Sequence, residues 1–168
     1  NQAIHGVDLL QWFAGMPVEV FAWSTQRVHA IESEDTCVAA LKFADGALGT
    51  IEGTTAGWPG WSRRIELCGE HGSVLLDDDD IARWDFRDAR PEDETIRAMR
   101  ESAAMGSGAA APMNIKIEGH VRQIQDFIDG IRERRPFFIE GVEACKAVAL
   151  VRAIYESAAS GRAVRPAS

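Results

Sequence analysis

The first half of the chain contains hydrophobic runs, separated by polar and glycine-containing segments, that predict β-strands. Six runs are rich in β-branched, aromatic or other apolar residues: 18–29, 36–43, 47–55, 63–68, 73–76 and 81–86. Asp45-Gly46 and the segment 69–72 separate neighbouring runs and are typical of tight turns, because glycine accepts positive φ. Short connections favour antiparallel pairing, so we expect a meander. Gly49 and Gly53 in the third run favour close approach of another surface.

Three further segments place apolar residues at helical spacing. The first begins at residue 1 and ends at Gly15, before Pro17, and the others span about 118–134 and 142–160. We expect the first two helices to bury one apolar stripe each and the third to be mostly buried. The expected stripes are Leu9, Leu10, Trp12 and Phe13 in the first helix and Val121, Ile124, Phe127, Ile128 and Ile131 in the second.

Together these elements predict an α+β fold, a mostly antiparallel open sheet of about six strands with helices on one face. We expect residues 1–168 to form one domain. Residues 87–114 combine a charged stretch with small residues, so we expect a flexible excursion there, with a short helix near 95–103. The strands carry apolar residues on both faces, for example Leu41 against Val38, which predicts a homo-oligomer formed through the open sheet face.

Composition narrows the classes of partner. The 168 residues include 18 Lys and Arg against 26 Asp and Glu, a formal net charge of −8, so the chain should repel nucleic acid. No apolar run approaches the roughly 20 residues of a transmembrane helix, so we expect no membrane insertion. Cys37, Cys68 and Cys145 are widely spaced, which indicates buried free thiols and a reducing, cytoplasmic compartment.

The first helix carries the main candidates for chemistry. Asn1, His5 and Asp8 lie at i−4, i and i+3, on one helical face. Asp8 could orient the His5 imidazole, and Asn1 could hydrogen-bond a substrate hydroxyl. The spacing alone also fits a structural surface histidine paired with an aspartate.

Other candidates are open to two interpretations. Trp58 could stack on a sugar or lie in a core or interface, and Arg64 could bind a carboxylate or only decorate a strand. The acidic run 77–80 lacks calcium-loop spacing and predicts a solvated turn. No ligand set suggests a metal site. No G-x-G-x-x-G unit occurs, so we expect no NAD or NADP bound to this chain alone.

Four motifs in order resemble the C-terminal domain of the Gfo/Idh/MocA family of NAD(P)-dependent oxidoreductases. Residues 1–15 look like its D/N-x-G-x-H-x-x-D-L-L-x-W-L-x-G segment, although Ala3 replaces the usual glycine. Residues 43–49 look like its F-x-D/N-G-A-x-G hairpin, and residues 65–74 like its I-x-G-x-x-G-S hairpin. The closing resemblance runs through 127–136, 149–157 and 161–164.

The resemblance implies a substrate-binding and oligomerisation domain that follows an N-terminal Rossmann domain, absent from this chain. It also implies NAD or NADP in the full-length protein, a sugar, cyclic polyol or derivative as substrate, and His5 assisting proton transfer at the substrate carbinol. The family's Glu-Lys-Pro motif is not present, and Asn1 stands where aspartate is common; an amide cannot serve as a general base. We therefore expect a piece of a longer oxidoreductase, inactive alone. The alternative is a non-catalytic binding or assembly module of the same fold.

Overall fold

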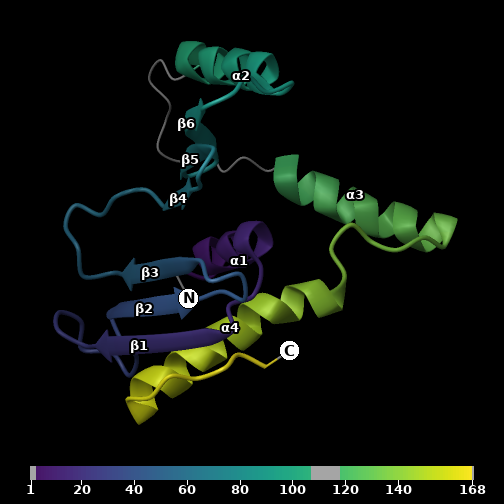
Figure 1. The fold of residues 1–168 in the computed structure, drawn as a ribbon. Helices are drawn as coiled ribbons and strands as arrows, with labels where there is room; N and C mark the ends of the chain where they lie inside the picture. The colour runs from purple at the N-terminus through teal and green to yellow at the C-terminus, as the bar shows by residue number, and fades with distance from the viewer. Residues whose placement is uncertain (1–2, 107–117, 168) are drawn as a thin grey trace. The chain divides into compact units, whose positions relative to one another are not determined.

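The computed structural model describes residues 3–106 and 118–167, and its helices and strands follow the order expected from the sequence (Figure 1). The elements are α1 (Ile4–Ala14), β1 (Glu19–Thr25), β2 (Thr36–Lys42), β3 (Leu48–Thr54), β4 (Arg64–Cys68), β5 (Gly72–Asp77), β6 (Asp80–Phe86), α2 (Asp93–Gly106), α3 (Glu118–Glu133) and α4 (Gly141–Ser160). The predicted α+β class is confirmed. No helix within the described ranges is long and apolar enough to cross a membrane.

The strands form two antiparallel sheets where the sequence predicted one. Strands β1, β2 and β3 pair in that order, and β4, β5 and β6 pair in a second sheet. The chain correspondingly divides into two compact units, the first containing Asn1–Trp61 and Ile139–Ser168 and the second Ser62–Phe138. Both predicted tight turns are present: the Gly46 amide donates to the Phe43 carbonyl oxygen, and the Gly69 amide to that of Gly72.

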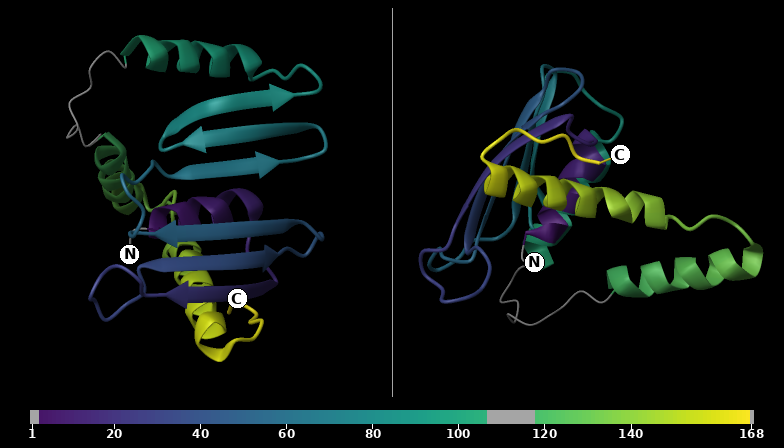
Figure 2. Two further views of the ribbon diagram at one scale, coloured as in Figure 1. Left: turned by 90° about the vertical axis from the view of Figure 1, so that its left-hand side faces the viewer. Right: turned by 90° about the horizontal axis from the view of Figure 1, so that it is seen from below.

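The core of the first unit lies between its sheet and the helices α1 and α4, which cover one sheet face (Figure 2). Alternation along the strands places Val20 and Leu41 on this face, where Leu150 of α4 is fully buried. The predicted α1 stripe was right for Leu10, which packs against the core, and wrong for Trp12 and Phe13. Val7 and Gln11 are buried, whereas Trp12 and Phe13 are about half exposed, because α1 packs on α4 through the opposite stripe.

The outer edge of β1 is closed by the end of the chain. Val20 and Val164 exchange two backbone hydrogen bonds, each 2.9 Å long. Two residues along, the Ala22 amide donates to the Ser157 hydroxyl at 3.0 Å, and that hydroxyl donates to the Arg162 carbonyl oxygen at 2.6 Å. These contacts hold α4, β1 and the C-terminal segment together and give the backbone groups of Val20 and Ala22 on the edge of β1 hydrogen-bond partners.

Strand β1 ends at Thr25, four residues before the predicted end, because a buried carboxylate organises the following loop. Asp35 Oδ2 accepts the backbone amides of Arg27, Val28 and His29 at 2.9, 2.7 and 3.1 Å. These bonds, led by that from Val28, lower the pKa of Asp35 to about 2. Three consecutive amides can point at one carboxylate oxygen only where the backbone turns, so the extended strand must end before them.

In the second unit, α2 covers 93–106 and is longer than the predicted short helix; residues 107–114 of the expected excursion lie outside the described residues. The predicted burial of the α3 stripe was wrong. Val121, Ile124 and Ile131 are each more than half exposed.

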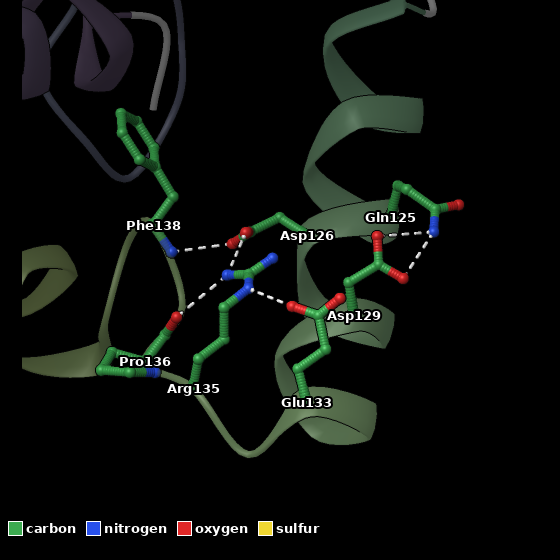
Figure 3. A network of polar contacts seen from close by, with 7 residues as sticks. All are labelled: Gln125, Asp126, Asp129, Glu133, Arg135, Pro136 and Phe138. Carbon is green, nitrogen blue, oxygen red and sulfur yellow. Dashed lines mark hydrogen bonds and ion pairs between the residues drawn. The ribbon is translucent and has the colours of Figure 1, made fainter.

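The C-terminal end of α3 is instead stabilised by a local network (Figure 3). The Asp126 carboxylate accepts hydrogen bonds from the Arg135 guanidinium at 2.8 Å and from the Phe138 backbone amide at 2.7 Å. Arg135 also forms an ion pair with Glu133 at 3.0 Å. The bond from Phe138, followed by that from Arg135, lowers the pKa of Asp126. The Phe127 and Phe137 rings stack beside this network at 4.9 Å.

Two further burial predictions need correction. Helix α4 is buried on one side only, since Val142 and Val148 remain more than half exposed. The cysteines are free thiols as predicted, but Cys68 and Cys145 are exposed and only Cys37 is partly buried.

Candidate functional site

Helix α1 presents His5 and Asp8 as exposed side chains in the first unit. No hydrogen bond or ion pair joins these two described side chains; Asp8 Oδ1 instead accepts a hydrogen bond from Gln11 Nε2 at 3.1 Å. The imidazole is therefore available to an incoming group, and Asp8 adds a negative charge three residues along the same helix. Asn1, the third predicted member, lies outside the described residues.

The start of α1 lies directly against β3. A Cβ atom placed on Gly53 would stand 3.0 Å from the Ala3 Cβ atom, closer than side-chain carbons normally approach. The expected close approach at this glycine strand is confirmed, and a larger residue at Gly53 would push the first turn of α1 away. Gly53 thereby fixes the position of the turn that leads into His5.

Trp58 lies in the loop that follows β3 in the same unit. Its side chain is 94% exposed, and that of Trp61 is 88% exposed. The base of the loop is held: the Ala56 amide donates to Thr54 Oγ1 at 3.0 Å, and the Thr55 amide to the Asp35 carbonyl oxygen at 2.8 Å. Two exposed indoles on an anchored loop are typical of a surface that binds a ligand or another protein.

Arg64 belongs to the second unit, on β4. It is exposed and makes a loose ion pair with Glu66, at 3.8 Å. Its neighbour Arg63 is engaged instead, with its guanidinium 2.9 Å from Asp79 and 2.7 Å from the Asp78 carbonyl oxygen. The acidic run forms the turn between β5 and β6, as predicted. Among the residues that the structure describes, no group of three His, Cys, Asp or Glu could hold a metal ion.

Sequence reasoning missed a cavity in the second unit. It has a volume of about 580 Å³ and is lined by parts of the β4–β5 turn, β6 and α2. Arg87, Arg97 and Arg100 all contribute to its wall. The available signal was the spacing of Arg97 and Arg100, three residues apart on one helical face, but without the tertiary structure nothing places them beside Arg87.

Comparison with known proteins agrees with the predicted resemblance. Residues 1–75 match the model of the GFO/IDH/MocA C-terminal domain. The WlbA dehydrogenase from Bordetella pertussis, crystallised with NADH and UDP-GlcNAcA, superposes on the whole chain with a TM-score of 0.84 and 30% identity. The predicted resemblance to the Gfo/Idh/MocA family is thus confirmed.

Two curated relatives are inositol dehydrogenases. The myo-inositol 2-dehydrogenase of Thermotoga maritima is 32% identical over 82 residues, and the inositol 2-dehydrogenase 2 of Paenarthrobacter aurescens is 29% identical over 84. These alignments cover 46% and 48% of this chain and 25% of each relative. The chain spans 47% of the WlbA protein, so it corresponds to about half of that dehydrogenase.

Proposed function

We propose that this chain is the substrate-binding domain of an NAD(P)-dependent oxidoreductase that acts on a sugar, a cyclic polyol or a derivative of one. The observation that carries the proposal is the similarity, across the full 168 residues, to a dehydrogenase crystallised with NADH and a sugar nucleotide. The inositol dehydrogenases among the relatives support a polyhydroxylated substrate.

The dinucleotide does not fit the residues present. Within the described ranges every strand pairing is antiparallel, and the one direct strand-to-helix connection, from β6 to α2, contains no glycine. A pyrophosphate site of the usual kind needs a glycine-rich turn between a parallel strand and a helix. Another part of the whole protein would therefore bind NAD or NADP, which exchanges a hydride with the substrate carbon.

The contribution of this chain would be proton transfer and binding. The exposed His5 imidazole takes the proton of the carbinol hydroxyl during oxidation and returns it during reduction, a general acid–base role that histidine most often fills in enzymes. Trp58, in the same unit as His5, offers an aromatic face to the C–H groups of a sugar ring. Arg64, on β4 of the second unit, is proposed separately as a cation for a carboxylate.

The test uses the whole protein with NAD⁺ and myo-inositol, and with UDP-GlcNAcA as a second substrate. His5→Ala should lower kcat about 10²–10⁴-fold, leaving the KM for NAD⁺ and the melting temperature near the wild-type values, since His5 is exposed. His120→Ala, an exposed histidine on α3, is the matched control and should leave kcat unchanged. If both variants turn over like the wild type, His5 is not catalytic. If the wild type oxidises neither substrate and binds no dinucleotide, the non-catalytic module is the better description.

The open face of the first sheet supports the proposed homo-oligomer. Trp23 and Val38 are paired across β1 and β2 on the face opposite α1 and α4, and are 62% and 39% exposed. The Phe21 ring meets the Trp23 ring edge-on at 4.5 Å and extends this apolar surface. We expect the protein to self-associate in sedimentation at about 100 µM and Trp23→Glu to shift it towards monomer, whereas Trp61→Glu, in the loop, should not. A monomeric wild type would contradict the assignment.

A further inference from the structure

The cavity of the second unit has an unusual wall, because the helix side that faces it carries arginines. Asp93, Ile96, Arg97 and Arg100 line the cavity from α2, at positions i, i+3, i+4 and i+7. On a helix that packs against a sheet, these positions ordinarily hold apolar residues. Here two of the four are cations, although the chain as a whole carries a net charge of −8.

The acids that line the same cavity are largely engaged elsewhere. Asp93 accepts the Trp84 indole N–H at 2.8 Å through one oxygen and the Arg90 amide at 2.9 Å through the other. Asp85 pairs with Arg83 at 3.1 Å. Glu70, at the β4–β5 turn, is exposed. The cavity therefore holds cationic groups that its acids do not neutralise by direct ion pairs.

Arg97 is the most available of these cations. Arg100 donates to the Ala82 carbonyl oxygen on the outer strand β6 at 2.9 Å, and Arg87 donates to the Glu70 carbonyl oxygen at 3.4 Å. Within the described part of the chain, the Arg97 guanidinium has neither a hydrogen bond nor an ion pair. Its charge acts on Asp93, one turn earlier on α2, but its N–H groups are not taken up by a hydrogen bond there. An arginine fork with such N–H groups, at a cavity wall, suits a planar or tetrahedral oxyanion that can accept two of them.

The wall around these arginines is held in place by its own contacts. The Arg87 amide donates to the His71 carbonyl oxygen at 2.9 Å, which ties the end of β6 to the β4–β5 turn. The Phe86 ring lies over Gly72, where any side chain would clash, and Arg90 lies over the same ring at 4.3 Å. A ligand would thus meet an arrangement that exists before binding, which lowers the entropic cost of association.

We propose that this cavity binds a small molecule through an oxyanion group, a phosphate or a carboxylate, with Arg97 as its principal contact and Arg87 as a second. The cavity volume of about 580 Å³ is in the range of small-molecule sites. This inference goes beyond the proposed dehydrogenase function and does not depend on it, because the site lies wholly within the second unit and its test measures binding only.

The test titrates the intact, ¹⁵N-labelled protein with inorganic pyrophosphate and, separately, with citrate at low ionic strength. The reporter is the Trp84 indole N–H resonance, assigned with Trp84→Phe, because that side chain lines the cavity. We expect saturable shifts of this resonance with at least one anion. Arg97→Gln should weaken binding about tenfold or more, whereas Arg122→Gln, the same charge change on exposed α3, should alter it less than twofold.

The two anions separate the two sources of the oxyanion group. Binding of pyrophosphate alone identifies a phosphate ligand, and binding of citrate alone a carboxylate ligand; each supports the site. The proposal is overturned if neither anion shifts the Trp84 resonance, or if Arg97→Gln and Arg122→Gln bind as tightly as the wild type. Far-ultraviolet circular dichroism of Arg97→Gln verifies that α2 remains folded.

Discussion

Removal of the Ser157 hydroxyl tests how the first unit is held together. This hydroxyl is fully buried and connects three parts of the chain: α4, on which it lies, Ala22 of β1 and Arg162 of the C-terminal segment. Ser157→Ala removes one oxygen and introduces no bulk. It leaves the Ala22 amide, in a residue only 1% exposed, without an acceptor.

The magnitude follows from the burial of the two partners. A buried donor that loses its acceptor costs about 1–3 kcal/mol, whereas a lost bond whose partner can turn to water costs about 1 kcal/mol or less. Ala22 belongs to the first class, and Arg162, an exposed residue, to the second. We therefore expect Ser157→Ala to lower the free energy of unfolding by about 2 kcal/mol, mostly through Ala22.

The assay is urea unfolding, combined with hydrogen exchange at the Ala22 amide. The amide should exchange faster in Ser157→Ala than the general loss of stability explains. Ser160→Ala is the matched control: it removes an exposed hydroxyl on the same helix whose hydrogen bond, to the Ser157 carbonyl oxygen, is long at 3.5 Å, and it should change stability by less than about 0.5 kcal/mol. If the free energy of unfolding of Ser157→Ala lies within about 0.5 kcal/mol of the wild-type value and hydrogen exchange at Ala22 is unchanged, the Ser157 hydroxyl does not stabilise the first unit in this way.

Two other perturbations probe single contacts. Because the pKa of Asp35 falls from its ordinary 3.8 to about 2 in the folded protein, its carboxylate contributes stability above pH 3.8 that is lost as the pH falls towards 2. Urea midpoints measured across this range should show the loss in the wild type and a smaller one in Asp35→Asn; equal slopes would argue against the three-amide arrangement. In α3, Gly130→Ala should destabilise the helix by about 1–3 kcal/mol, because the new Cβ would stand 2.6 Å from the Phe137 ring. At Gly119, on the same helix, an added Cβ would have no atom within 4 Å, so Gly119→Ala should stabilise the helix by about 0.5–1 kcal/mol. Both variants are compared with the wild type in thermal melts followed by circular dichroism. Similar effects of the two changes would exclude the ring contact.

The sequence by itself determined the features that depend on neighbouring residues. The hairpin at Asp45-Gly46 follows from glycine's access to positive φ, and Gly46 adopts a φ of 91°. The end of α4 follows in the same way from Gly161, whose amide donates to the Ser157 carbonyl oxygen with φ at 64°. Strand periodicity likewise placed Leu41 and Val38 on opposite faces, and Leu41 is buried whereas Val38 is 39% exposed. The histidine of the family motif could be found without coordinates, since a motif is a local pattern.

Only the tertiary structure decided which apolar stripes are buried and which distant groups meet. Helix α1 offered two plausible sides, and packing on α4 selected the side with Val7 and Gln11. The bond between Ala22 and Ser157 joins residues 135 positions apart, a separation that no periodicity encodes. Arg97 became a candidate ligand-binding residue only when α2 was placed on β6. Periodicity records what one segment could bury, whereas burial itself requires a partner surface, and long-range pairing in the folded chain supplies that partner.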